Sequence, residues 1–148
     1  MSLESKIQKD LIVAMKAKDE KALRAIRAIK SALILFKTSG SNAELDEEAE
    51  IKMLQKMVKQ RKESLSIFET QGRAELAQTE REEIQVIEQY LPKQLGADEI
   101  EASIKTIIGD LGATGMKDMG KVMAAANKQF AGKAEGAVIS GIVKRLLA

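Results

Sequence analysis

The stretch Tyr90-Leu91-Pro92 separates two differently composed parts of this 148-residue sequence. Pro92 is the only proline in the chain. Proline has no amide hydrogen and pushes the preceding residue away from helical backbone angles, so a helix that approaches Pro92 has to end before it. Glycine use changes at the same point, because only two of the ten glycines precede Pro92. We therefore expect a hinge here that joins two domains, residues 1–91 and residues 92–148.

Apolar residues before Pro92 recur at spacings of three and four, which is typical of amphipathic helices, and no alternating strand pattern is present. We expect about four helices in residues 1–91. Their apolar stripes are Leu3, Ile7, Leu11, Ala14 and Met15; Leu23, Ile26, Ala28 or Ile29, Leu33 and Phe36; Ile51, Leu54, Met57, Val58, Leu65 and Phe68; and Leu76, Ala77, Ile84, Ile87 and Leu91.

Polar residues and glycines mark the expected ends of these helices. Asp19 and Asp46 carry side chains that accept hydrogen bonds from the free amide groups at a helix N-terminus. Ser39-Gly40-Ser41 is expected to close the second helix. The third helix is the longest, from Asp46 to Gln71, and Gly72 fits the position just after it, where a left-handed backbone is common.

The eight glycines after Pro92 predict short helices joined by tight turns. We expect the first from about Ala97 to Leu111, the second from near Asp118 and the third from about Ala134. Their apolar residues are Ile100, Ile104, Ile107 and Leu111; Val122, Met123, Ala126 and Phe130; and Val138, Ile139, Ile142, Val143, Leu146 and Leu147. The fold class expected for the whole chain is all-α, with three helices in the second domain.

Cysteine and histidine are both absent from the chain. Their absence excludes disulfides, thiolate and imidazole ligands, cysteine nucleophiles and histidine proton shuttles. No glycine-rich loop has the form that cradles phosphates in nucleotide hydrolases. We therefore expect no catalytic residue, no metal site and no cofactor.

The sequence contains no run of about 20 apolar residues that could span a bilayer, and its N-terminus lacks the pattern of a secretory signal. We therefore expect a cytoplasmic protein without a membrane partner. The sequence carries no signal for a particular oligomeric state.

Four carboxylates lie close together on the fourth predicted helix: Glu80, Glu82, Glu83 and Glu88. They could form a paired-carboxylate or di-metal site, or they could be ordinary exposed helix charge. Metal sites in helical bundles also use histidine, which this chain lacks. Exposed charge is therefore the better interpretation.

Arg61 interrupts the apolar stripe of the third predicted helix, between Val58 and Leu65. A charged residue at such a position usually pairs with an opposite charge nearby. We expect a structural ion pair with a glutamate, for example one from the fourth helix. Ligand binding by Arg61 is the alternative.

Basic residues gather near the C-terminal end of the sequence. Residues 1–91 hold 16 basic and 16 acidic side chains, whereas residues 112–148 hold six basic and two acidic ones. Two of the lysines flank a predicted helix N-terminus that has a small Gly120 and could hold a phosphate. The side chains expected to contact nucleic-acid phosphates are Lys117, Lys121, Lys128, Lys133, Lys144 and Arg145. Aromatic platforms for single-stranded RNA are missing, which leaves recognition of folded RNA by shape and backbone.

Four motifs, taken together in their order and spacing, resemble the YqeY family, also called GatB/YqeY-domain proteins. The resemblance covers about residues 3–147. Its motifs are Lys59-Gln60-Arg61-Lys62-Glu63-Ser64, Gly72-Arg73-Ala74-Glu75-Leu76-Ala77, Tyr90-Leu91-Pro92-Lys93-Gln94-Leu95 and Met119-Gly120-Lys121-Val122-Met123. Two positions depart from the family pattern, because Glu135 stands where Asp is frequent and Gly96 replaces a Ser or Thr cap.

The resemblance implies a four-helix N-terminal domain and a C-terminal domain similar to the tail of the B subunit of the tRNA-dependent amidotransferase. That tail contacts tRNA and is not catalytic. The kinase-like catalytic body of the B subunit lies outside the matched region and has no counterpart in this chain.

Three functions are consistent with these observations. The first is a non-catalytic tRNA-binding or amidotransferase-related accessory module. The second is an accessory factor without RNA binding, which docks on an amidotransferase, an aminoacyl-tRNA synthetase or another protein through the long third helix or the hinge cleft. The third is a carbon–nitrogen ligase with glutamine as amide donor, an activity suggested by the family name, for which the chain offers no nucleophile or ATP site.

Overall fold

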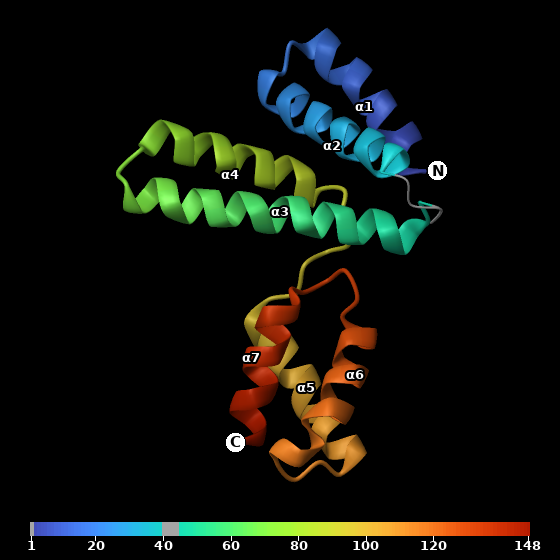
Figure 1. Cartoon of the computed structure of the whole chain (residues 1–148), viewed down its shortest axis with the longest axis vertical. Helices are drawn as coiled ribbons and strands as arrows, with labels where there is room; N and C mark the ends of the chain where they lie inside the picture. The colour runs from blue at the N-terminus through green and yellow to red at the C-terminus, as the bar shows by residue number, and fades with distance from the viewer. Residues whose placement is uncertain (1, 40–44) are drawn as a thin grey trace. The chain divides into compact units, whose positions relative to one another are not determined.

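The computed structural model describes residues 2–39 and 45–148, and every regular element in this part of the chain is a helix (Figure 1). The all-α prediction is confirmed. The chain divides into two compact units, Met1–Leu91 and Pro92–Ala148. Each unit has its own cluster of buried apolar side chains, so each is described separately.

The first unit consists of two helical hairpins. Its described helices are α1 (Leu3–Ala17), α2 (Glu20–Thr38), α3 (Glu47–Thr70) and α4 (Ala74–Glu88). Helix α1 packs on α2 and α3 packs on α4, while the contact of α2 with α4 joins the two hairpins (Figure 1). The largest fully buried side chains of this unit are Ile7, Ile29, Leu54 and Ile87.

The helix caps follow the sequence prediction. The side chain of Asp19 accepts a hydrogen bond from the amide of Ala22 at 3.1 Å, and that of Asp46 accepts one from the amide of Ala49 at 2.8 Å. Gly72 follows α3 in the left-handed region, with φ of 71°. The expected end of α2 at Ser39-Gly40-Ser41 is only partly described, because α2 ends before Ser39 and the other two residues lie outside the described ranges.

Four residues assigned to buried stripes are in fact exposed. They are Met15, Leu76, Leu111 and Val138, with exposed fractions between 41% and 55%. Three of them adjoin a buried apolar residue. Successive helix residues point about 100° apart, so the neighbour of a core residue can lie at the edge of the buried face and be exposed. Leu111 is the last residue of its helix.

The second unit is a three-helix domain made of α5 (Ala97–Leu111), α6 (Met119–Gln129) and α7 (Gly136–Leu147). A short 3-10 turn, η1 (Met116–Asp118), precedes α6, and α7 begins two residues later than predicted. The three helices pack on one another around a core of Ile100, Ile104, Val122, Ala126, Phe130, Ile139 and Val143.

The chain is anchored on both sides of Pro92. On one side, the Tyr90 hydroxyl donates a hydrogen bond to Asp10 of α1 at 2.6 Å, and the Lys6 ammonium lies 5.2 Å from the centre of the Tyr90 ring. Burial, and then the hydrogen bond to Asp10, raise the pKa of Tyr90. On the other side, the Gln94 side chain donates to the carbonyl of Gly132 at 2.7 Å, and the Leu95 amide donates to the carbonyl of Lys133 at 2.9 Å.

The Tyr90–Asp10 hydrogen bond is testable by Tyr90→Phe, which keeps the ring and removes the hydroxyl. We expect the free energy of unfolding to fall by about 2 kcal/mol, since a part-buried hydrogen bond to a carboxylate is lost. Urea unfolding measures this, and the same change in an Asp10→Ala background should cost much less. An equal loss in both backgrounds would show that the hydrogen bond does not hold Tyr90 on α1.

Candidate functional site

The six cations predicted to contact nucleic acid are all exposed, but they occupy three different places in the second unit. Lys121 and Lys128 lie on the same face of α6, because seven residues make about two helical turns. Lys117 lies in η1, directly before α6. The structure therefore places three of the six cations along η1 and α6.

Asp118 lies at the start of α6, where a phosphate was expected to bind. Its carboxylate accepts a hydrogen bond from the Thr114 amide at 2.9 Å. This hydrogen bond, followed by the charges of Lys117 and Lys121, lowers the pKa of Asp118. The negative charge of Asp118 thus already offsets part of the positive potential at the N-terminus of α6. The exposed side of α6 is therefore the more accessible place for a phosphate.

The remaining three cations lie after α6. Lys133 stands in the loop between α6 and α7, where its backbone amide and carbonyl are both hydrogen-bonded and its side chain is exposed. Arg145 of α7 lies 3.1 Å from Glu101 of α5, and this hydrogen bond is the main reason that the pKa of Glu101 is lowered. Lys144 points about 100° away from Arg145 around the helix. Arg145 therefore has a structural partner, and the structure does not gather all six cations into one patch.

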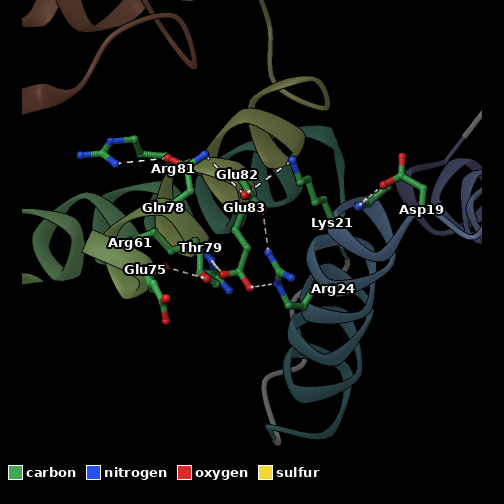
Figure 2. Close-up of polar contacts among 11 residues, drawn as sticks. Asp19, Lys21, Arg24, Arg61, Glu75, Gln78, Thr79, Arg81, Glu82 and Glu83 are labelled. Carbon is green, nitrogen blue, oxygen red and sulfur yellow. Dashed lines mark hydrogen bonds and ion pairs between the residues drawn. The ribbon is translucent and has the colours of Figure 1, made fainter. Parts of the chain in front are cut away.

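A network of ion pairs joins the two hairpins of the first unit (Figure 2). Arg24 of α2 lies 3.1 Å from Glu82 and 3.4 Å from Glu83, both on α4. Lys21 adds a longer contact of 3.7 Å to Glu82. Desolvation acts to raise the pKa of Glu82, but the hydrogen bond from Arg24 and the charge of Lys21 outweigh it, and the pKa is lowered.

Arg61 of α3 completes this network. Its Nε donates to Glu83 at 2.9 Å and its Nη1 donates to the carbonyl of Met57 at 3.2 Å. The Arg61 and Glu83 side chains are 19% and 14% exposed, so the pair is largely shielded from water. Glu83 is thereby shared between an arginine of α2 and an arginine of α3 (Figure 2).

Glu80 is the carboxylate that this network leaves least satisfied. Its Oε2 atom is buried and makes no hydrogen bond. Burial raises the pKa of Glu80, the charge of Glu83 raises it further, and the charge of Arg61 opposes both. Glu80 therefore lies near Glu83 and Arg61 with one carboxylate oxygen unpaired.

Three of the four predicted glutamates, Glu82, Glu83 and Glu88, pair with cations. The expectation of exposed charge is wrong for Glu82 and Glu83, because the packing of α2 and α3 on α4 covers most of their side chains. Glu88, the fourth of them, lies 4.0 Å from Lys62. Within residues 2–39 and 45–148, no three carboxylates are grouped in a way that could hold a metal ion. The sequence offered no signal for the pairing of Lys21 and Arg24 with Glu82, because residues about 60 positions apart meet only through the packing of α2 on α4.

These features define a small helical protein with an ion-paired N-terminal unit and a C-terminal unit that carries exposed lysines along η1 and α6. The family model described as Yqey-like protein matches residues 4–147. The chain therefore belongs to the YqeY family, as the sequence motifs predicted.

The curated relatives found by comparison carry the name altered inheritance of mitochondria protein 41, mitochondrial. The protein of Lachancea thermotolerans is 32% identical over 107 residues, which are 71% of this chain and 57% of the relative. That of Kluyveromyces lactis is 31% identical over 108 residues, or 71% of this chain and 58% of the relative. The protein of Pyrenophora tritici-repentis is 28% identical over 131 residues, which are 87% of this chain and 71% of the relative. The chain thus spans less than two thirds of the length of the first of these relatives.

These names correct one expectation. The sequence predicted a cytoplasmic protein, whereas the relatives are named as mitochondrial proteins. The prediction is wrong on this comparison because its two criteria, a missing apolar span and a missing secretory signal, do not separate the cytosol from the mitochondrial interior. Separately, no helix within the described ranges has the length and apolar character needed to cross a membrane.

Arg61 and Arg81 provide a matched test of the ion-pair network. Arg61→Ala should lower the free energy of unfolding by about 2 kcal/mol, because it leaves a shielded Glu83 with one fewer partner. Arg81 pairs with Glu69 at a site where both side chains are about half exposed, so Arg81→Ala should cost less than about 0.5 kcal/mol. Urea unfolding of both variants measures the difference. Equal stability of Arg61→Ala and the wild type would instead favour ligand binding by Arg61.

Proposed function

We propose that this chain is a non-catalytic accessory protein whose Pro92–Ala148 unit contacts the backbone of a folded RNA such as tRNA. The observation that carries the proposal is the line of exposed lysines along η1 and α6, Lys117, Lys121 and Lys128. Asp118 is the only acidic residue in this stretch, and its carboxylate is already hydrogen-bonded to the Thr114 amide. Lysines that face solvent in this way can neutralise phosphates and release their counterions.

The aromatic content favours backbone contacts over base stacking. Phe130 is the only aromatic residue after Pro92, and it is buried in the core of the second unit. No aromatic ring is therefore available there to stack on an unpaired base. Contacts from lysines to phosphates suit a folded RNA, which proteins recognise largely through shape and backbone.

The family resemblance supports the same assignment. The tail of the amidotransferase B subunit, which this unit resembles, contacts tRNA without catalysis, and an amidotransferase or an aminoacyl-tRNA synthetase would be a suitable protein partner. We propose no carbon–nitrogen ligase activity for the chain alone, because it has neither cysteine nor histidine to activate glutamine or move protons. Protein docking, the second candidate function, is favoured by an apolar groove between α2 and α3 of the first unit.

Charge reversal on α6 tests the RNA contact. If three lysines neutralise phosphates, the logarithm of the affinity for unmodified tRNA should fall with the logarithm of salt concentration at a slope of about −2.7. Lys121→Glu and Lys128→Glu should each weaken binding about tenfold and reduce the slope by about one. Electrophoretic or fluorescence titrations at several salt concentrations measure both quantities.

Lys105→Glu is the matched control, since it reverses the same charge in the same unit but on α5. Lys105 is exposed, and Arg145 still holds its partner Glu101 when the lysine is removed. We expect this variant to bind tRNA as the wild type does. A salt-independent affinity, or equal losses in all three variants, would overturn the proposal.

A further inference from the structure

A groove of about 510 Å³ lies between α2 and α3 and is lined by residues of the first unit alone. Its apolar lining comes from the last turns of α2 and the first half of α3: Ala32, Leu35, Phe36, Ala49, Met53 and Met57. Helix α2 packs mainly on α1 and α4. Its side toward α3 is therefore left open over this region.

The apolar surface of this groove is accessible. Leu35 is 69% exposed, more than any other large apolar side chain in the described residues. Phe36 and Met53 are half-buried, whereas Met57 is buried at the base of the groove. Methionine side chains are flexible and polarisable, and they adapt to apolar residues of different shape. The groove thus has the form that accepts the apolar face of a helix.

Positive charge runs along one edge of this groove. Lys52 and Lys56 line the groove, and Lys59 lies about one turn further along the same side of α3. Lys52 contacts Glu48 at 3.1 Å, while the other two make no ion pair with any described residue. The surrounding segment is acidic overall, with seven basic and eleven acidic residues between positions 45 and 91. The basic edge is therefore a local feature beside the groove.

We propose that this groove binds an amphipathic helix of a partner protein that carries acidic residues beside its apolar face. The apolar residues would cover Leu35, Phe36 and Met53, and the acidic residues would face the lysine edge. Helix α1 of a second copy fits less well, because its exposed apolar residues Ile12 and Val13 are flanked by Lys9 and Lys16. This inference does not depend on RNA binding by the second unit.

Two synthetic peptides test the proposal against the full-length chain. Both are amphipathic helices of about 18 residues, or five turns, with leucines on one face. One has glutamates beside the leucines and the other has lysines at the same positions. Fluorescence anisotropy should show that the acidic peptide binds at least tenfold more tightly, with an affinity that weakens as salt is added.

Matched variants locate the binding site. Leu35→Asp and Lys56→Glu should each weaken binding of the acidic peptide at least tenfold. Val13→Asp and Lys16→Glu make the same changes at exposed positions of α1 and should leave binding unchanged. Circular dichroism shows whether each variant is folded, and both groove positions are exposed enough to tolerate substitution.

Three results would overturn the proposal. The first is equal affinity for the acidic and basic peptides, and the second is binding that Leu35→Asp does not affect. The third is a concentration-dependent dimer that Leu35→Asp abolishes, because the occupant would then be a second copy. Failure of tRNA binding in the α6 variants has no bearing on these outcomes, so the two proposals can fail separately.

Discussion

Pro92 restricts the backbone of the residue before it and donates no hydrogen bond, and the remainder of the chain is organised around this break. Helix α4 ends at Glu88, and Tyr90 is then held on α1 by its hydrogen bond to Asp10. Two residues beyond the proline, Gln94 is held by the loop that connects α6 with α7. A short segment therefore separates two apolar cores, and each core is complete within its own unit.

The first unit depends on a second interaction, the sharing of α4 carboxylates between arginines of α2 and α3. Glu83 contacts both Arg24 and Arg61, so the polar face of α4 helps to join the two hairpins. Carboxylates held in this way are poorly suited to bind a metal or to move protons, because their charges are already compensated. The same unit leaves an apolar groove open between α2 and α3. The ion pairs and the groove are the basis for proposing that the N-terminal unit is a scaffold with a docking surface.

Local sequence signals predicted most of the fold. The spacing of apolar residues, the caps at Asp19 and Asp46 and the glycine at position 72 identified the helices and most of their ends to within about two residues. The fourth helix ends at Glu88, three residues before Leu91, which was assigned to its stripe. The same signals did not decide which of two adjacent apolar residues faces the core, as at Ala14 and Met15, because that depends on where the neighbouring helix lies. These signals also did not predict which residues far apart in the sequence contact one another. The sequence marked Arg61 as unusual. Only the packing of the helices shows that Arg24 pairs with Glu82 and that a groove lies between α2 and α3. The structure also shows that the Asp118 carboxylate, beside the lysines of α6, accepts a hydrogen bond from the Thr114 amide.

The central claim is that the two units have separate roles, with RNA contact in the second and protein docking in the first. Hydrogen–deuterium exchange of the full-length chain, with and without saturating tRNA, tests it most directly because it reports on every helix at once. We expect slower exchange of amides between residues 116 and 145 and unchanged exchange in α2 and α3. Protection that appears in α2 and α3 instead, or that appears nowhere at saturation, would contradict it.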